Sequence, residues 1–460
     1  MNGTLILGAT GSGKTSGSGR AIALSLLQAG FGGLVLTAKS EERALWESYC
    51  REAGRLNDLL IFGPDEPLRF NFLDHERQRK GAGAGLTENI VQLLMNLQEV
   101  AHTRAGQSGS GEKDEYWQEA KEQLTRNCID LLSWATEHVT VRDLHQLVNS
   151  APTSEAQANS DAWKNWSFCY KCLAAADNRS LTVEQRDDLK VVADFFLTEF
   201  PAIAGKTRGI ITSTFTSMVD VLNRGILRKL LCSETTVTPE VVETGKILLL
   251  DLPIMEFARV GQLAQAIWKY SFQRSISRRN IANSPRPVFL WADEAQYFLT
   301  SHDMMFQSTC RSYRVATVLL SQNVSNFYAV LGGGEKARSE ADSLFGNLNT
   351  KICHANGDSV TNEWAAKLIG QSRQFLVNAN NSYDPSDWMS AVTGVGRTQQ
   401  TSSGISESYQ FEVQPCVFTT LRTGGYEYNG DVDAIVIQNG KTFRDTSRTW
   451  RLATFQQTPG

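Results

Sequence analysis

The residues with the clearest chemical meaning form an eight-residue stretch close to the start of the printed sequence. GATGSGKT matches the pattern GxxxxGK[ST] at every fixed position. The stretch consists of Gly8, Ala9, Thr10, Gly11, Ser12, Gly13, Lys14 and Thr15. In such a loop the glycines let backbone N–H groups surround phosphate oxygens, the lysine adds a positive charge, and the threonine hydroxyl can bind Mg²⁺. Because an apolar run precedes the loop and a helical pattern follows it, we predict a nucleotide site for ATP and Mg²⁺ rather than a glycine-rich turn.

Two acidic residues at the end of a later apolar run could complete this site. VFLWADEA places Asp293 and Glu294 directly after an apolar run of strand length. In proteins with such a phosphate-binding loop, an aspartate helps to hold Mg²⁺ and an adjacent glutamate can act as general base toward water. An apolar run that ends in Asp-Glu is common by itself and gains weight from the loop in the same chain. Asp251, in LLLDLP, is a weaker metal candidate because no acid follows it.

An amide and two arginines are further candidates for the same chemistry. Gln322 lies just past the apolar run VATVLLS, where its side chain could sense the γ-phosphate and orient water. Arg311 and Arg314, in CRSYRV, could stabilise transition-state charge on a phosphate that a neighbouring subunit holds. Solvent-facing arginines and a capping glutamine are the alternative interpretation. A second set of arginines could bind nucleic-acid phosphates. A solvated helix end is the favoured interpretation of this set, which consists of Arg274, Arg278, Arg279 and Arg286.

The composition predicts a water-soluble chain of more than one domain. Its 460 residues exceed one ordinary core, and 41% hydrophobic with 20% charged residues is typical of globular proteins. A formal net charge of −4 argues against a broadly basic surface but leaves room for a local basic channel. No apolar run reaches the roughly 18 residues of a membrane span. Cys169 and Cys172 have CxxC spacing without a second pair, so unpaired thiols are favoured over a zinc site.

The pattern of apolar runs predicts where the elements lie that position these residues. TLILG, LVLTA and LLIFG read as strands, separated by a helix from Lys14 to Gln28 and a second helix that begins near Ser40. This alternation predicts a parallel sheet covered by helices. Helical patterns then dominate, over 87–102, 115–138, 141–149 and 183–199. We therefore expect an all-α segment, 75–205, inserted between two parts of one α/β domain, 1–74 and 206–460.

The α/β pattern is expected to resume near Ile210. The later apolar runs of strand length are KILLLDLP, PVFLWADEA, VATVLLSQ, TKICH, CVFTTL and AIVIQNGKTF. Asn439-Gly440, inside the last run, is a hairpin signal. Residues 379–410 are rich in Asn, Ser, Thr, Gln and Gly, which predicts a polar loop or hairpin.

The order of these motifs resembles a known family, the TraG/TraD-like type IV coupling proteins of bacterial conjugation and type IV secretion. These proteins belong to the FtsK–HerA group of ring-forming, DNA-pumping ATPases. The matching segments, in chain order, are LGATGSGKT, LVLTAKSEE, LLIFGPDEPLRFNFLD, YWQEAKEQLTRNCIDLL, TVRDLHQLV, VFLWADEAQYF, CRSYRVATVLLSQNVSNFYAVLG and LFGNLNTKICHANGD. They cover nearly the whole chain, and their order and spacing are more specific than any segment beyond the phosphate loop.

The resemblance implies a fold, an activity and partners. The expected fold is a RecA-like P-loop NTPase domain with a mainly parallel sheet and an inserted all-α domain. The expected activity is ATP hydrolysis that drives DNA through a hexameric ring, with ATP sites between subunits. By motif position, Lys14 and Thr15 bind nucleotide and Mg²⁺, Asp293 binds the metal, and Glu294 is the catalytic acidic residue. Gln322 matches the sensor, and Arg311 matches an arginine that reaches a neighbour's site. A relaxase or a membrane-anchored secretion component is an expected protein partner.

Two departures from the family pattern keep alternatives open. Family members usually carry an N-terminal membrane anchor, whereas here the phosphate loop starts at the eighth residue, so we expect no membrane span in this chain. We expect a cytoplasmic protein, either unattached or peripheral at the inner face of the membrane. The turn TAKSEE also lacks the usual Asp and Gly. One alternative is a related ring ATPase in phage defence, DNA processing or effector translocation. Another is a nucleotide-gated scaffold, against which the Asp293-Glu294 pair argues.

Overall fold

The structure, a computed structural model, is described for residues 3–81, 83–103, 112–382 and 400–457. Its centre is a nine-stranded sheet in the order β11-β10-β7-β1-β6-β5-β2-β4-β3, in which β10 runs antiparallel to both of its neighbours, β7 and β11, and all other pairs are parallel. The strands are β1 (Thr4–Leu7), β2 (Gly32–Leu36), β3 (Leu59–Phe62), β4 (Ile247–Leu250), β5 (Val288–Ala292), β6 (Val315–Ser321), β7 (Thr350–Cys353), β10 (Asp431–Gln438) and β11 (Trp450–Gln456). The predicted α/β fold with a mainly parallel central sheet is confirmed.

Both faces of the sheet are covered, which explains why its strands read as continuous apolar runs. In β1, Leu5 and Leu7 face one hydrophobic cluster and Ile6 faces the other. Helices α1 (Arg20–Gln28) and α2 (Glu41–Glu52) cover the Ile6 face, where the ring of Trp46 stacks on Phe289 at 5.7 Å between centroids. The helices on the opposite side of the sheet include α14 (Ile254–Arg278), α15 (Ser301–Thr309), α16 (Val324–Val330) and α17 (Gly334–Asn347). The sheet is thus the rigid support for the loops at its edge.

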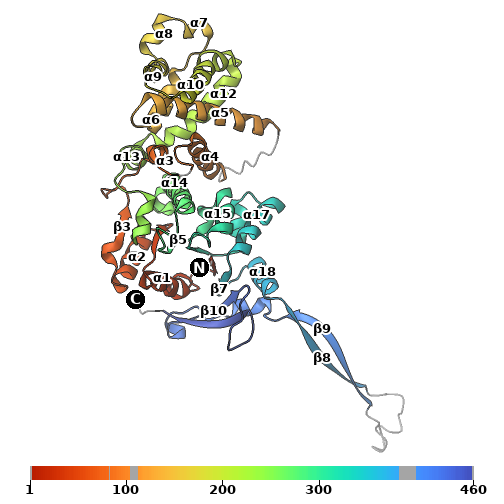
Figure 1. The fold of residues 1–460 in the computed structure, drawn as a ribbon. Coiled ribbons are helices and arrows are strands. Elements are labelled where there is room, and N and C mark those ends of the chain that lie inside the picture. Colours follow the sequence, from red (N-terminus) through yellow and green to blue (C-terminus); the bar gives the residue numbers. More distant parts are fainter. Residues whose placement is uncertain (1–2, 82, 104–111, 383–399, 458–460) are drawn as a thin grey trace, which may run out of the picture.

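A helical segment lies between β3 and β4 and forms one end of the molecule (Figure 1). Its helices are α3 (Phe72–Gln78), α4 (Thr87–Thr103), α5 (Glu112–Ala135), α6 (Val141–Ser150), α7 (Glu155–Ala158), α8 (Asp161–Trp166), α9 (Phe168–Asp177), α10 (Val183–Asp194), the π-helical turn Phe195–Glu199, α11 (Phe200–Ala202), α12 (Gly205–Leu222) and α13 (Gly225–Leu231). The expectation that the α/β pattern resumes at Ile210 is wrong, because helices continue to Leu231. Within α12, buried apolar residues recur at helical spacing (Ile211, Phe215, Val219, Leu222), which the intervening Thr and Ser residues obscure in the sequence. The proposed domain limits remain a prediction.

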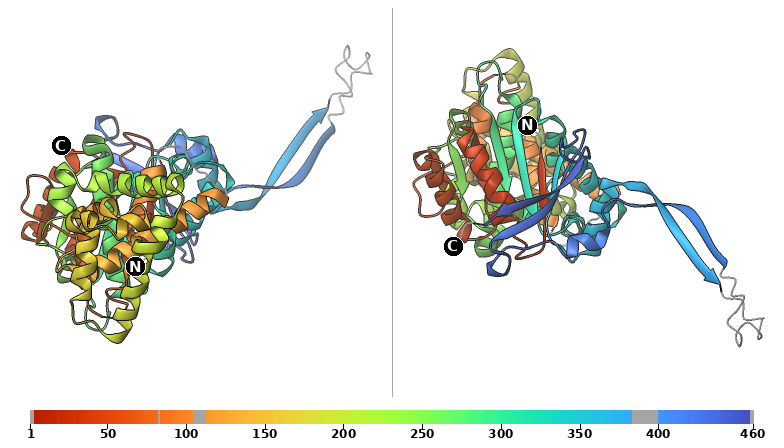
Figure 2. Two further views of the ribbon diagram at one scale, coloured as in Figure 1. Left: turned by 90° about the horizontal axis from the view of Figure 1, so that it is seen from above. Right: turned by 90° about the horizontal axis from the view of Figure 1, so that it is seen from below.

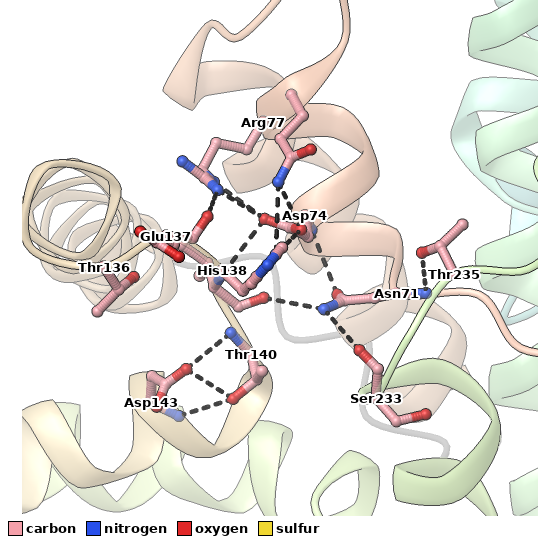
Figure 3. A network of polar contacts seen from close by, with 12 residues as sticks. Asn71, Asp74, Arg77, Thr136, Glu137, His138, Thr140, Asp143, Ser233 and Thr235 are labelled. Atoms are coloured by element: carbon pink, nitrogen blue, oxygen red, sulfur yellow. Dashed lines mark hydrogen bonds and ion pairs between the residues drawn. The ribbon is translucent and has the colours of Figure 1, made fainter.

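A polar network around Asp74, at the start of the helical segment, ties that segment together (Figure 3). The Asp74 carboxylate accepts hydrogen bonds from Arg77, from Gln78 and from the Nδ1 atom of His138, at 2.7–2.8 Å. Asn71 caps α3 through Asp74 and donates to the carbonyl oxygens of Val139 and Ser233. Three stretches that are distant in sequence therefore meet here: the exit from β3, the loop before α6 and the return toward β4.

The remaining elements complete the α/β part of the molecule and add a projecting two-stranded arm. These are α18 (Ser359–Ile369), the 3₁₀ turns Leu56–Asp58, Pro239–Thr244, Ala295–Tyr297, Pro415–Thr419 and Tyr426–Tyr428, and the antiparallel pair β8 (Gln371–Ser382) and β9 (Gln400–Phe411). Figure 2 shows that β8 and β9 extend away from the body as a two-stranded ribbon. The predicted hairpin over 379–410 is present in its described part, and residues 383–399 lie outside the described residues.

Three local predictions need correction. CVFTTL is not a strand but the 3₁₀ turn Pro415–Thr419, because Pro415 starts the turn and only Phe418 of its side chains is buried. The signal at Asn439-Gly440 does lead β10 into an antiparallel return, but β11 starts only at Trp450, so the connection is long. The helix predicted from Lys14 begins as a π-helical turn, Thr15–Gly19, before α1.

Two expectations about composition can be compared with the structure. All eight cysteines are free thiols, and seven of them are buried, including Cys169 and Cys172. Among the described residues, no cluster of three or more His, Cys, Asp or Glu side chains could hold a metal ion. In the same part of the chain, none of the helices is both long enough and apolar enough to span a lipid bilayer.

Candidate nucleotide-binding site

The predicted phosphate loop lies at the carboxyl-terminal edge of the sheet and is anchored to the neighbouring strands. The N–H of Gly8 donates to the carbonyl oxygens of Ser321 and Gln322 at 3.3 and 3.2 Å, and the N–H of Ala9 donates to Ala355 at 2.9 Å. Gly11 and Gly13 adopt positive φ values of 76° and 79°. Left-handed glycines next to right-handed residues, directly before a helix, are typical of backbone turns that bind phosphate oxygens through their N–H groups.

The small residues after Thr15 allow the first helical turn to pack tightly. Gly17, Ser18 and Gly19 are buried, and a Cβ atom at Gly17 would lie 3.3 Å from the Cβ of Val432. A Cβ atom at Gly19 would lie 2.8 Å from the carbonyl oxygen of Lys14. The two glycines are therefore explained by close approach: strand β10 packs against Gly17, and the backbone of the turn itself leaves no room for a side chain at Gly19.

Asp293 contacts Thr15, the residue with which it is predicted to bind Mg²⁺. The Thr15 hydroxyl donates to Oδ2 of Asp293 at 3.2 Å, although the two residues are 278 positions apart. Burial raises the pKa of Asp293, and the nearby ammonium of Lys14 opposes this rise. A hydroxyl and a carboxylate are hard oxygen ligands that suit Mg²⁺. The Ser12 hydroxyl, 1% exposed, has no hydrogen-bond partner among the described residues, so the loop also contains a polar group suited to a phosphate oxygen.

Glu294 is held by two amide side chains and faces a lysine. The Nε2 atom of Gln322 donates to Oε1 at 3.2 Å, and the Nε2 atom of Gln296 donates to Oε2 at 3.0 Å. The ammonium of Lys39 lies 3.7 Å from Oε1. Glu294 has a φ of 47°, a left-handed conformation that costs a non-glycine residue about 1–2 kcal/mol. The turn after β5 thus aims this carboxylate toward the end of β6, where Gln322 lies.

Several contributors to this edge were not found in the sequence. Lys39 and Gln296 contact Glu294, and Glu42 fixes the turn after β2 by accepting the N–H groups of Ala38 and Lys39 at 3.0 and 2.9 Å. Burial raises the pKa of Glu42 to about 8, and Asp293 adds to the rise. We predicted Ser40-Glu41-Glu42 only as a helix start. The signal that could have indicated a role for Glu42 is its position three residues after Lys39, just past the end of a strand.

A buried histidine connects the loop to strand β10. The Ser18 hydroxyl and Nε2 of His354 are 2.7 Å apart, and Nδ1 of His354 lies 3.1 Å from the carbonyl oxygen of Asp433. Burial lowers the pKa of His354 to about 4, so the ring is neutral at pH 7. His354 was not among the predicted residues, because nothing in TKICH indicates which helix its side chain meets.

Arg311 is the one predicted site residue that lies far from the loop within its own chain. It sits in the exposed turn between α15 and β6, before the strand begins. Strands β1 and β6 are parallel, with Leu7 opposite Ser321, so Arg311 occupies the opposite edge of the sheet from the phosphate loop. Arg314, the other candidate, donates to the carbonyl oxygen of Pro285 at 2.8 Å, which favours a structural role.

The weaker candidates are used within the fold. Asp251 pairs with Arg43 at 2.8 Å, which is a structural ion pair. The arginines considered for nucleic acid make internal contacts: Arg274 with Asn89, Arg278 with Glu76, Arg279 with the carbonyl oxygens of Arg286 and Tyr313, and Arg286 with the carbonyl oxygen of Gly30. These arginines therefore form a helix end that is bonded into the fold, and only Arg286 is exposed as expected for the solvated helix end that was predicted.

Comparisons with known proteins agree with this architecture. Residues 287–412 match the family model described as the TraM recognition site of TraD and TraG. The structure of the bacterial conjugative coupling protein TrwB, in its unbound form lacking 70 N-terminal residues, superposes with a TM-score of 0.61 at 14% identity, over 99% of this chain and 85% of that one. No curated protein sequence is significantly similar to the chain.

Two nucleotide complexes of TrwB are also similar in fold. TrwB with a non-hydrolysable GTP analogue gives a TM-score of 0.61, and TrwB with ADP and Mg²⁺ gives 0.59, each at 14% identity and with the same coverage of 99% and 85%. The predicted RecA-like P-loop NTPase fold is thereby confirmed, and so is the resemblance to TraG/TraD-like coupling proteins.

Proposed function

We propose that this protein is an ATP-hydrolysing DNA translocase of the conjugative coupling type. The observation that carries the enzymatic part is the convergence of Thr15, Asp293, Glu294 and Gln322 from three separate segments at one edge of the sheet. A scaffold that only bound nucleotide would not need a carboxylate oriented by two amides beside the metal-binding pair. Turnover of ATP is therefore favoured over nucleotide-gated assembly.

The residues divide the chemistry among themselves. The N–H groups of the loop other than those of Gly8, Ala9 and Ser12, which bond within the fold, bind the phosphates together with the ammonium of Lys14, and Thr15 with Asp293 holds Mg²⁺. The metal, when bound, neutralises charge on the phosphate oxygens. Glu294 accepts a proton from the attacking water, while Gln322 holds the Glu294 carboxylate in place and senses the γ-phosphate. Arg311, at the opposite edge of the sheet, supplies positive charge to the site of a neighbouring subunit.

We extend the proposal to a hexameric ring that encloses DNA. Its support is the likeness of fold to a conjugative coupling protein over 99% of the chain, together with the exposed position of Arg311. The net charge of −4 implies that any DNA-binding surface is a local channel rather than the whole exterior. A relaxase or a membrane-anchored secretion component is the proposed protein partner, and the match at 287–412 marks the region to test for such contacts. The proposed location is the cytoplasm, at the inner face of the membrane when such a partner is engaged.

The test is DNA-stimulated ATP hydrolysis by the full chain and matched variants. Wild-type protein is expected to hydrolyse ATP faster when DNA is added at low salt. Glu294→Gln should lower kcat by roughly 10²- to 10⁴-fold with nucleotide binding retained, as for loss of a general base. Lys14→Ala should lose nucleotide affinity. Glu363→Gln, an exposed position on α18, is the matched control and should hydrolyse ATP like the parent.

The opposite results would separate the alternatives. A Glu294→Gln variant as active as the parent would remove Glu294 from the chemistry and favour the scaffold. Hydrolysis that ignores DNA would count against a translocase and favour a ring ATPase that acts in another process, such as effector translocation. Particle images of the protein with ATP and DNA would then show whether a ring forms and whether DNA passes through it.

A further inference from the structure

The antiparallel pair β10–β11 overlies the phosphate loop. Cys353 is opposite Leu7 in the β1–β7 pair and opposite Ile435 in the β7–β10 pair. Residues 431–434 therefore extend past the edge of the sheet at which the loop lies. A Cβ atom at Gly13 would lie 2.6 Å from Cγ2 of Val432, so the strand rests directly on the loop.

Gln457 connects the residue after Thr15 to a turn before β10. Its Nε2 atom donates to the Ser16 hydroxyl at 2.6 Å, and its Oε1 atom accepts the N–H of Gly425 at 2.9 Å. These two contacts hold the turn at Gly424 and Gly425 beside the start of the helix that follows the loop. Both halves of the Gln457 amide are thereby occupied.

The segment 422–430 is fixed by a dense set of polar contacts. Gly430 donates to the carbonyl oxygen of Gly425 at 2.8 Å, Gln457 donates to that of Gly430 at 2.8 Å, Gln456 donates to that of Asn429 at 2.8 Å, and Arg422 pairs with Asp431 and Asp433 at 2.6 and 2.7 Å. Despite this order, the Tyr426 side chain is fully exposed, at 101%. A loop that is held by this many polar contacts and presents one aromatic ring to solvent is suited to stack on a planar ligand, because little conformational entropy is lost on binding.

The order of strands indicates which part of a nucleotide would reach this loop. Seen from β1, strands β6 and β5 with Asp293 and Glu294 lie on one side, and β7 and β10 lie on the other. The metal and the terminal phosphate belong on the acidic side. The nucleoside is attached at the other end of the phosphate chain, so we expect it on the β10 side, near Thr15 and Ser16, where Gln457 and the turn at Gly425 are.

We propose that Tyr426 and the turn Gly424–Gly425 form the subsite for the base and ribose of the bound nucleotide. Gln457 is a positioning residue that holds this turn against Ser16. The inference rests on the proposed function, since it assumes a nucleotide in the phosphate loop. Stacking uses the face of the base and is tolerant of its identity, and the nearest amide is already engaged. The subsite therefore recognises a nucleobase without strong preference between ATP and GTP.

The experiment compares ATP with inorganic tripolyphosphate, which has the phosphates but neither base nor ribose. Binding of each to the full chain is measured by calorimetry. Tyr426→Ala should weaken ATP and GTP binding about tenfold, within the range for loss of one base–aromatic stack, and leave tripolyphosphate unchanged. Tyr426→Phe keeps the ring and should bind ATP like the parent. Gln457→Ala should reproduce the ATP-selective loss, because it releases the turn from Ser16.

Two controls distinguish failure of this inference from failure of the proposed function. Tyr409→Ala removes another exposed tyrosine, on the β8–β9 ribbon, and should leave both ligands unaffected. Lys14→Ala should weaken both ligands, since both use the phosphate loop. If Tyr426→Ala binds ATP as tightly as the parent, or weakens tripolyphosphate equally, the base subsite is overturned while the phosphate loop stands. If the parent binds neither ligand, both proposals fail.

Discussion

At the scale of single residues, the two adjacent carboxylates after β5 differ in their surroundings. The Asp293 carboxylate accepts a hydrogen bond from the Thr15 hydroxyl and lies near the ammonium of Lys14. These neighbours suit a carboxylate that shares a metal cation with a phosphate. Glu294 is instead fixed by amide donors from Gln296 and Gln322, which orient its carboxylate, and its ion-pair partner is the partly exposed ammonium of Lys39 at 3.7 Å. The same side-chain chemistry, placed one residue apart, thus suits two roles, metal binding and proton acceptance.

Lys351, on β7, is a buried cation for which the fold provides no compensation. Its Nζ atom has no hydrogen-bond partner among the described residues, and burial lowers its pKa from 10.5 to about 8. Replacement by methionine, which has a similar shape, should therefore stabilise the protein at pH 7 by about 2–3 kcal/mol. The measurement is the urea dependence of unfolding of parent and Lys351→Met.

The pH dependence gives this prediction its sign. Below pH 8 the Lys351 amine is protonated in both the folded and the unfolded chain, so the free-energy cost of burying its charge is fully present. Between about pH 8 and 10.5 the unfolded chain binds more protons, so the parent gains stability and the advantage of Lys351→Met should shrink. Lys206→Met, at an exposed position of α12, should change stability little at either pH. An advantage that stayed constant to pH 10.5 would show that packing, not charge, is responsible.

The sequence identified the residues that carry a recognisable spacing and missed those that act through the fold. Gly8 to Thr15 lie in one contiguous motif, and Asp293 with Glu294 ends an apolar run, so both could be predicted. Lys39, Gln296 and His354 have no such signature, because their roles follow from strand order, which brings the ends of β2, β5 and β7 to one edge. Arg311 was predicted from the motif order, and its distance from the loop in the same chain could only be seen in the structure.

At the scale of elements, the Asp74 network determines how the helical segment is attached. Burial raises the pKa of Asp74, but hydrogen bonds from His138 and Arg77 outweigh it, so the pKa lies below the ordinary value. Asp74→Asn removes the charge, and the new amide N–H group of the asparagine would face the N–H donors of His138 and Gln78. We expect a loss of about 2–3 kcal/mol of stability at pH 7, as for loss of hydrogen bonds to a buried charged group.

Urea unfolding and limited proteolysis measure this effect together. Cleavage between α3 and α6 should become faster in Asp74→Asn, because the loop at His138 and Val139 loses its anchor. Since the folded pKa is depressed, the stabilisation is present above the ordinary aspartate pKa and is lost as pH falls through the folded value. The difference between parent and variant should therefore decrease in acid. Asp65→Asn, at an exposed position, is the control, and a loss of equal size there would refute a specific role for Asp74.

Element type could be predicted where the periodicity was strong and failed where side chains obscured it. The strands β1, β2, β3, β5 and β6 are apolar on both faces and were found as runs. Helix α12 was missed because Thr and Ser separate its buried positions, and CVFTTL was mistaken for a strand because apolar content was weighed above Pro415. Register, and with it the contact of β10–β11 with the phosphate loop, depends on long-range pairing that no local pattern specifies.

At the scale of the whole molecule, the position of Arg311 has a direct consequence for assembly. The turn that contains Arg311 and the phosphate loop are separated by the length of β6, seven residues or roughly 20 Å. One chain cannot bring its own Arg311 to its own site without unfolding the sheet. If Arg311 acts in hydrolysis, each site must therefore be composed of two chains.

A subunit-mixing experiment tests this arrangement. Lys14→Ala chains lack a working phosphate loop, and Arg311→Ala chains lack the arginine, so each variant alone should hydrolyse ATP far more slowly than the parent. When the two are mixed, denatured and reassembled in equal amounts, an interface is complete wherever Lys14 comes from one chain and Arg311 from its neighbour. Random assembly gives about a quarter of such interfaces, so activity should rise toward about a quarter of the parent's, if sites act independently.

Arg314→Ala chains, whose lost arginine bonds within the fold, serve as the control. They should be active alone. If Arg311→Ala alone is as active as the parent, the arginine has no role in hydrolysis. If mixing restores no activity although rings form, Arg311 acts within its own chain, and the distance between Arg311 and the phosphate loop is not maintained in the active state.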